Sequence, residues 1–281
     1  MSSEVTFYIP AYNAEETIEK SIISILNQKL TVDEIIIVDD CSMDNTSKII
    51  KKYKNIKLLR NDKNMGLGYN RNLAIKNSKN NIIASIDADV EIDENWLYEL
   101  HGKIINSNIS MCGGKMIEKF TNKPANAWRS KYYSQNWGDK NNENPPFLYG
   151  CNTLIKKDFW RKVNGYNENL KTNGEDVEFS NKVKSLKNSN LFYSSKATCY
   201  HLQNDNLDSL SKRVWRYHSF AYKIKKPSKL KLIKLTIKQF KFMILRILEN
   251  LFKFNLFFMW ISFVVFIKFV NNEIKHLIDH K

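Results

Sequence analysis

The chain has 281 residues, of which 43% are apolar, so it can bury the core of one sizeable domain with an appendage. Its net charge of +15 is uneven, because residues 212–281 hold 16 of the 44 Lys and Arg but only 3 of the 29 Asp and Glu. Four scattered cysteines favour reduced cytosolic thiols over a disulfide framework or a zinc site. The first apolar run begins at Val5 with no basic region before it, which predicts that there is no secretory signal.

Strands and helices alternate in the first part of the chain. Short apolar runs predict strands over residues 5–9, 34–38, 56–59 and 82–86. Longer amphipathic segments predict helices over residues 15–28, 45–53, 67–77 and 95–106. This alternation predicts an α/β fold with a mostly parallel sheet, right-handed crossovers and flanking helices.

The middle of the chain is less regular. A strand is predicted over residues 113–118, followed by a polar, aromatic stretch of loops and short helix that ends at Pro146. Further strands are predicted over 148–156 and 191–201, and helices over 157–164 and 175–186. We therefore expect an α/β domain over residues 1–210 and a separate helical tail over 211–281.

The tail predicts a membrane-associating extension. From residue 230 to 254, charged residues recur mostly every three or four positions between aliphatic ones, which is typical of an amphipathic helix with a basic face. Residues 256–267 then carry no charge, but spanning a bilayer takes about 20 apolar residues. An interfacial pair of helices on anionic lipid is therefore expected, and packing on the body of the protein or on a partner subunit is the alternative. The aliphatic residues between the lysines argue against nucleic acid.

Polar clusters follow three of the predicted strands. They begin at Pro10, Asp39 and Asp87. Because the carboxyl ends of parallel strands lie at one edge of a sheet, we expect the clusters to converge on a site for a polar ligand such as a nucleotide.

Asp87 and Asp89 are two carboxylates one residue apart at the end of a buried strand. Crowded carboxylates repel each other unless a cation lies between them, and oxygen ligands suit Mg²⁺ or Mn²⁺. A solvated acidic loop is the alternative interpretation.

The ordered set of motifs resembles family 2 glycosyltransferases of the GT-A fold, over residues 5 to about 201 but not the tail. The matching residues are Pro10-Ala11-Tyr12-Asn13, Val38-Asp39-Asp40-Cys41-Ser42, Asp44, Thr46, Asn64, Gly66, Arg71-Asn72, Asp87-Ala88-Asp89, Gly150-Cys151-Asn152, Gly165-Tyr166, Glu175-Asp176 and His201.

The resemblance implies a donor site at the first strand ends. Ala11, Tyr12 and Asp39 would hold the nucleotide base and ribose, with Asp40 close by. The alternative for the acidic pair is a turn and helix cap. Arg71 would lie near the nucleotide or diphosphate, and the alternative is an exposed helix charge.

The resemblance also implies a divalent metal, Mg²⁺ or Mn²⁺. Asp89 would bind it directly, Asp87 would face the ribose or the metal, and His201 would be the third protein contact. A purely structural histidine is the alternative for His201.

Glu175 and Asp176 follow Gly174 at the start of a predicted helix. In the resemblance, Asp176 is the general base for the acceptor hydroxyl and Glu175 helps to position it. Gly150 and Asn152 would shape the sugar and acceptor pocket. The alternative for the acidic pair is ordinary charge placement at a helix N-terminus.

These features together predict an inverting glycosyltransferase that moves a sugar from a nucleotide-diphosphate sugar to a hydroxyl of a lipid-linked or cell-surface glycan. It would work at the cytoplasmic face of the cell membrane as a peripheral or monotopic protein. A polyprenyl-phosphate glycosyltransferase and a non-catalytic membrane adaptor stay open. A nucleotidyltransferase is disfavoured, because residues 10–16 lack a Gly-rich loop with Arg and Lys.

Overall fold

The computed structural model describes residues 3–105, 108–219 and 228–279. The chain forms two compact units. The first comprises Met1–Lys119 and Gln135–Leu202, and the second comprises Phe120–Ser134 and Gln203–Lys281.

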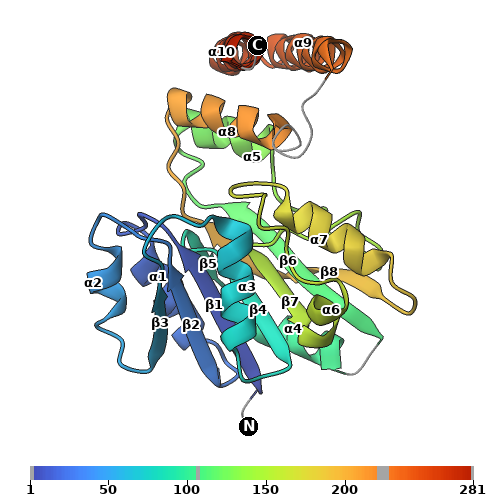
Figure 1. Ribbon diagram of the computed structural model, residues 1–281. Coiled ribbons are helices and arrows are strands. Elements are labelled where there is room, and N and C mark those ends of the chain that lie inside the picture. Colours follow the sequence, from blue (N-terminus) through green and yellow to red (C-terminus); the bar gives the residue numbers. More distant parts are fainter. Residues whose placement is uncertain (1–2, 106–107, 220–227, 280–281) are drawn as a thin grey trace. The chain divides into compact units, whose positions relative to one another are not determined.

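The first unit is built on a mixed sheet of eight strands within the described residues (Figure 1). Their order in the sheet is β3-β2-β1-β4-β7-β6-β8-β5. The strands are β1 (Val5–Ala11), β2 (Glu34–Asp39), β3 (Ile56–Arg60), β4 (Ile82–Ile86), β5 (Val90–Ile92), β6 (Ile109–Glu118), β7 (Asn152–Lys156) and β8 (Asn190–His201). The four neighbours β3, β2, β1 and β4 are parallel, as predicted.

The rest of the sheet mixes directions. β7 runs antiparallel to both β4 and β6, while β8 runs parallel to β6. β5 pairs antiparallel with β8 and was not predicted, because three residues between two acidic segments give no clear strand pattern. The predicted strand over 148–156 begins only at Asn152, so Gly150 lies in the loop before β7.

Helices cover both faces of this sheet (Figure 1). They are α1 (Ile18–Leu26), α2 (Thr46–Ile50), α3 (Leu67–Asn77), α4 (Trp96–Ile105), α6 (Lys157–Lys162) and α7 (Glu175–Lys184). Residue 106, the last of the helix predicted over 95–106, lies outside the described residues.

Strand alternation divides the core of the first unit into two apolar layers. Phe7 and Ile9 of β1 pack with residues of α1 and α4, whereas Tyr8 packs with residues of α3 and α7. Successive side chains of a strand point to opposite faces, so a strand buried on both sides reads as a continuous apolar run. This is why the parallel strands are visible in the sequence.

The second unit is helical. Its helices are α5 (Pro124–Tyr132), α8 (Leu207–Ser219), α9 (Lys229–Leu251) and α10 (Leu256–Asp279). A small apolar core joins α5, α8 and α10 through Trp128, Leu210, Val214, Ile261 and Val265. Leu256–Ile278 of α10 is long and apolar enough to cross a membrane, by length and composition alone, although 28% of its most apolar window is buried inside the protein.

Candidate active site

The carboxyl ends of β1 and β2 lie side by side. Ala11, the last residue of β1, pairs in register with Asp39, the last residue of β2. Ala11 is buried, and the next residue, Tyr12, is 51% exposed. The ring of Tyr12 is therefore accessible at the edge where the nucleotide is expected.

Asp39 and Asp40 are both buried and hold loops at this edge. Asp39 accepts hydrogen bonds from the Ser42 backbone N–H at 2.9 Å and from the Ser47 hydroxyl at 2.5 Å. Asp40 accepts one from the Gly66 backbone N–H at 2.9 Å, just before α3. Asp39 and Asp40 thus stabilise a turn, as the alternative interpretation proposed. Their contact with a nucleotide stays a prediction.

Arg71 of α3 is an internal bridge. Its side chain is 1% exposed, so the exposed-charge alternative is wrong. One guanidinium nitrogen lies 3.0 Å from Asp87 Oδ1, and Nε lies 3.3 Å from Glu175 Oε1. The guanidinium also donates to the Ser85 hydroxyl and to the Gly150 carbonyl, at 2.6 and 2.9 Å. Arg71 therefore ties the end of β4 to the start of α7.

Negative charge is concentrated around Asp87. Burial raises the pKa of this carboxyl, Arg71 opposes the shift, and the charges of Asp89 and Asp176 add to it. A carboxyl in this surrounding is stabilised in its charged form by a nearby cation.

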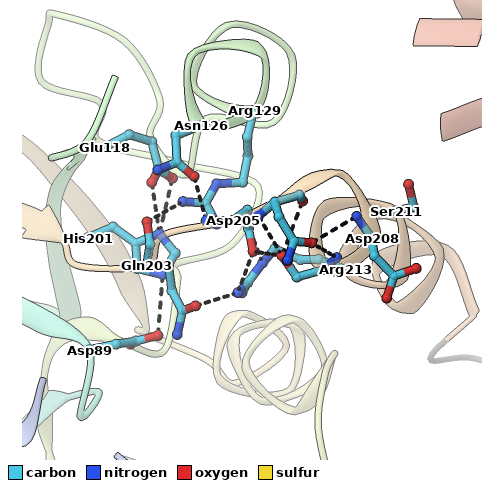
Figure 2. Close-up of polar contacts among 12 residues, drawn as sticks. Asp89, Glu118, Asn126, Arg129, His201, Gln203, Asp205, Asp208, Ser211 and Arg213 are labelled. Atoms are coloured by element: carbon cyan, nitrogen blue, oxygen red, sulfur yellow. Dashed lines mark hydrogen bonds and ion pairs between the residues drawn. The ribbon is translucent and has the colours of Figure 1, made fainter. Parts of the chain in front are cut away.

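His201 ends β8 and is 4% exposed. Its Nε2 lies 3.4 Å from Asp89 Oδ2, and its Nδ1 lies 3.0 Å from Glu118 Oε2 (Figure 2). The sheet register places these groups, because His201 pairs with Val90 of β5 and with Glu118 of β6. Burial lowers the pKa of His201, but Asp89 and Glu118 raise it overall.

The donor set around His201 fits a divalent cation. A metal-ligating histidine typically has its second ring nitrogen on a carboxylate, which is the position of Glu118. Glu118 was not predicted, since its pairing with His201 depends on a register between β6 and β8 that the sequence does not reveal. Among the residues described, no three His, Cys, Asp or Glu side chains are already grouped as a metal site, and Asp87 faces Arg71.

Glu175 and Asp176 begin α7 directly after Gly174, whose φ is 85°. Asp176 Oδ2 accepts from the Gly150 backbone N–H at 3.0 Å. Burial raises the pKa of Glu175 to about 8, with the charge of Asp176 adding to the shift and Arg71 opposing it. Glu175 Oε2 is buried and has no hydrogen-bond partner in the described part of the chain.

Gly150 is the point where these groups meet, because its carbonyl binds Arg71 and its N–H binds Asp176. A Cβ at this position would lie 3.0 Å from both Arg71 Nη2 and Asp176 Cβ, so any side chain here would crowd these two groups. Asn152 is 2% exposed and accepts a hydrogen bond from Trp96 Nε1 at 2.5 Å. Its part in a sugar pocket stays a prediction.

The mostly parallel sheet with polar groups at the strand ends is GT-A-like. Residues 6–163, more than half of the chain, match the profile of the family described as "Glycosyl transferase family 2". The chain therefore belongs to glycosyltransferase family 2.

Two curated relatives are similar over part of their length. The chain is 36% identical over 112 residues to the UDP-Glc:alpha-D-GlcNAc-diphosphoundecaprenol beta-1,3-glucosyltransferase WfgD of Escherichia coli, covering 39% of this chain and 44% of the relative. It is 34% identical over 95 residues to the poly(ribitol-phosphate) beta-N-acetylglucosaminyltransferase TarS of Staphylococcus aureus, covering 32% and 17%. Both matches span less than half of the relative.

Solved structures share the fold. The crystal structure of S. aureus TarS 1–349 in complex with UDP aligns with a TM-score of 0.59 at 17% identity, covering 98% of this chain and 91% of that one. The mannosyltransferase PcManGT from Pyrobaculum calidifontis in complex with GDP-Man and Mn²⁺ aligns with a TM-score of 0.60 at 16% identity, covering 80% and 65%.

Proposed function

We propose that this protein is an inverting, divalent-metal-dependent glycosyltransferase that moves a sugar from a nucleotide-diphosphate sugar to an acceptor hydroxyl. One observation carries the proposal. Gly150 binds Asp176 through its N–H and binds Arg71 through its carbonyl, and Arg71 holds Asp87. A carboxylate able to act as a base is thus fixed in the same network as a carboxylate on the donor side.

The donor nucleotide binds at the ends of β1 and β2. Tyr12, half exposed beside Ala11, contacts the base, and Asp39 contacts the ribose. Asp40 shapes the loop before α3. Arg71 acts on the donor through Asp87, since the guanidinium is surrounded by protein oxygens.

Asp89 and His201 would hold the divalent ion, with Asp87 nearby. When bound, the ion neutralises charge on the departing diphosphate. The bound Mn²⁺ named for PcManGT, which shares the fold, supports this choice of cofactor.

Asp176 accepts the proton of the acceptor hydroxyl as its oxygen attacks the sugar. Glu175 supports the start of α7, and Gly150 and Asn152 border the sugar and acceptor pocket. A single displacement inverts the anomeric configuration. A base favours a hydroxyl acceptor over a lipid phosphate, which already carries the charge needed for attack.

The acceptor belongs to a lipid-linked or cell-surface glycan at the cytoplasmic face of the membrane. The diphosphoundecaprenol acceptor named for WfgD supports a lipid-linked acceptor. The basic amphipathic helix α9 and the apolar helix α10 support a position on anionic lipid.

Asp176→Asn tests the base. We expect donor binding to stay, measured as Mn²⁺-dependent thermal stabilisation by a panel of nucleotide sugars, and turnover to fall by about 10²–10⁴-fold. Turnover is the release of nucleoside diphosphate in the presence of acceptor.

Glu178→Gln is the matched control, because Glu178 lies on the same helix in a surface ion pair with Lys182. Unchanged turnover in Asp176→Asn would remove Asp176 from the base role. If no nucleotide sugar stabilised the protein and no nucleoside diphosphate were released, the result would favour a non-catalytic adaptor.

A further inference from the structure

Helix α9 has two sides of different character. On its inner side, Arg246 Cζ lies 5.0 Å from the ring centroids of Trp128 of α5 and of Tyr133 just after that helix, and Met243 is buried. On the opposite side, apolar residues at intervals of three or four are 38–61% exposed. This α9 stripe consists of Leu230, Ile233, Ile237, Phe240, Ile244, Leu248 and Leu251.

Helix α10 repeats the arrangement. Ile261 and Val265 are buried with Trp128, and the Trp128 indole donates to the Ser262 hydroxyl at 2.9 Å. Apolar residues that are 40–70% exposed form the α10 stripe: Leu256, Trp260, Phe263, Ile267, Ile274 and Ile278. Because both helices pack on α5 by their inner sides, both stripes point away from it.

The turn between the two helices presents two aromatic side chains. Phe252 is 82% exposed and Phe254 is 90% exposed. Phe254 also has a φ of 51°, in the left-handed region where a bulky side chain is disfavoured and glycine or asparagine is usual. An exposed phenylalanine in a strained backbone does not stabilise the fold, which indicates that its partner lies outside the chain.

The charges around the α9 stripe identify the partner. Exposed lysines flank the stripe at Lys231, Lys234, Lys238 and Lys241, and Glu249 is the one acidic residue of α9. A second copy of the chain would bring like charges together. An anionic bilayer matches both the apolar stripe and the lysines, whose stems lie along the apolar surface while their ammonium groups reach the phosphates.

We propose that α9 and α10 lie flat in the headgroup region of an anionic bilayer, with both stripes facing the lipid and with Phe252 and Phe254 inserted at the turn. This inference rests on the membrane location proposed above and specifies its geometry.

The charged residues on the inner side of α10 argue against a membrane-spanning helix. Lys268 pairs with Asp208 of α8 at 2.7 Å, and Glu273 of α10 is buried. A spanning α10 would draw α8, with Asp208, Lys212 and Arg213, into the hydrocarbon, which is strongly unfavourable. In the flat arrangement the inner side stays packed on α5 and α8. The exposed apolar side enters the bilayer by about 5–10 Å.

Depth measurement on α10 separates the two geometries. Nitroxide labels are attached to single cysteines at Leu256, Ile267 and Ile278, which lie on the α10 stripe at the start, middle and end of the helix, in a background with Cys41→Ser. Collision with oxygen and with a water-soluble nickel complex reports depth in vesicles of phosphatidylcholine and phosphatidylglycerol. We expect three similar, shallow depths. A deep Ile267 between two shallow ends would overturn the flat arrangement.

Two substitutions at the turn test insertion without loss of the fold. Phe252→Ser with Phe254→Asn places asparagine where the backbone favours it, and we expect binding to these vesicles to fall at least about tenfold at unchanged thermal stability. Tyr98→Ser, an exposed aromatic on α4 at 62%, is the control and should bind as the parent does.

Equal vesicle binding by the turn variant and the parent would overturn the proposal. So would absence of vesicle binding in the parent, which would point to a protein partner instead. Stabilisation by nucleotide sugar, measured in the same samples, keeps failure of this proposal separate from failure of the proposed activity.

Discussion

Arg71 shows how one buried residue connects motifs that are distant in the chain. It ion-pairs with Asp87, donates a hydrogen bond to Glu175 and is itself fully enclosed. Burial acts to lower the pKa of Arg71, but the two carboxylates and nearby tyrosines raise it well above its usual value. Arg71 therefore stays charged, and its removal would leave the partly buried Asp87 and the buried Glu175 without this partner.

Arg71→Leu should lower the free energy of unfolding by about 3–5 kcal/mol, the usual cost of leaving a buried charge unpaired. Urea unfolding followed by circular dichroism measures this. Arg161→Leu is the control, since Arg161 pairs with Asp158 on the surface and such pairs contribute about 0–1 kcal/mol. Equal losses in the two variants would contradict the bridging role.

Glu118 orients the imidazole of His201 through Nδ1. We expect Glu118→Gln to weaken Mn²⁺ binding by about 10–100-fold, the usual effect of removing a carboxylate behind a metal-bound histidine. Calorimetric titration with Mn²⁺ in the absence of donor measures the affinity directly. Glu91→Gln, in a surface ion pair with Lys119, should leave it unchanged. Normal Mn²⁺ affinity in Glu118→Gln would exclude this positioning role.

Glu175 predicts a pH dependence of stability. Burial, the charge of Asp176 and the opposing effect of Arg71 together raise its pKa to about 8 from 4.5. The folded state therefore keeps a proton that the unfolded chain releases above its lower pKa. Between these two values the unfolded state binds fewer protons, so this group makes the free energy of unfolding fall as pH rises.

Glu175→Gln keeps the neutral shape and should remove this contribution. Urea unfolding of both proteins over about pH 5 to 8 should show a steeper decline for the parent. Parallel curves would mean that Glu175 is already ionised in the folded protein.

At the scale of elements, α9 is held on α5 by an aromatic cage. Arg246 lies 4.9–5.0 Å from the ring centroids of Trp128, Tyr132 and Tyr133. The Tyr132 hydroxyl also donates to Glu249 at 3.0 Å. Cation–π contacts contribute about 0.5–2 kcal/mol each, so this cluster adds to the packing that holds α9.

Arg246→Ala should therefore loosen α9 locally. We expect faster hydrogen exchange in α9, measured by mass spectrometry, with no change in the buried strands β1 and β4. Lys241→Ala removes an exposed charge from the same helix and is the control. Faster exchange in both variants would show that lost charge, not the cage, is responsible.

Across the whole molecule, the sequence revealed what local pattern encodes. Continuous apolar runs located the parallel strands, because a strand that is buried on both faces is apolar at every position. Apolar residues at intervals of three or four located α9, because this helix has one apolar face. The enclosure of Arg71 was not predictable in this way. A charged residue on α3 looks exposed until the loop at Gly150 and the start of α7 are known to cover it.

The packing of residues 120–134 could not be predicted either. Their polar, aromatic composition predicts loops and short helix, but it does not indicate that Trp128 packs with Ile261 and Val265 in one core. Such contacts depend on which segments meet in three dimensions, and the periodicity of one segment does not record its partner.

The division of the chain also bears on how parts of this protein could be exchanged with those of another. The polypeptide passes between the units three times, after Lys119, after Ser134 and after Leu202. A chimera that transfers only the C-terminal segment to another domain would lack α5. The apolar core of the transferred helices would then be incomplete, because Trp128 packs against Ile261 and Val265. Recombination that preserves both halves must move two separate stretches of the gene together.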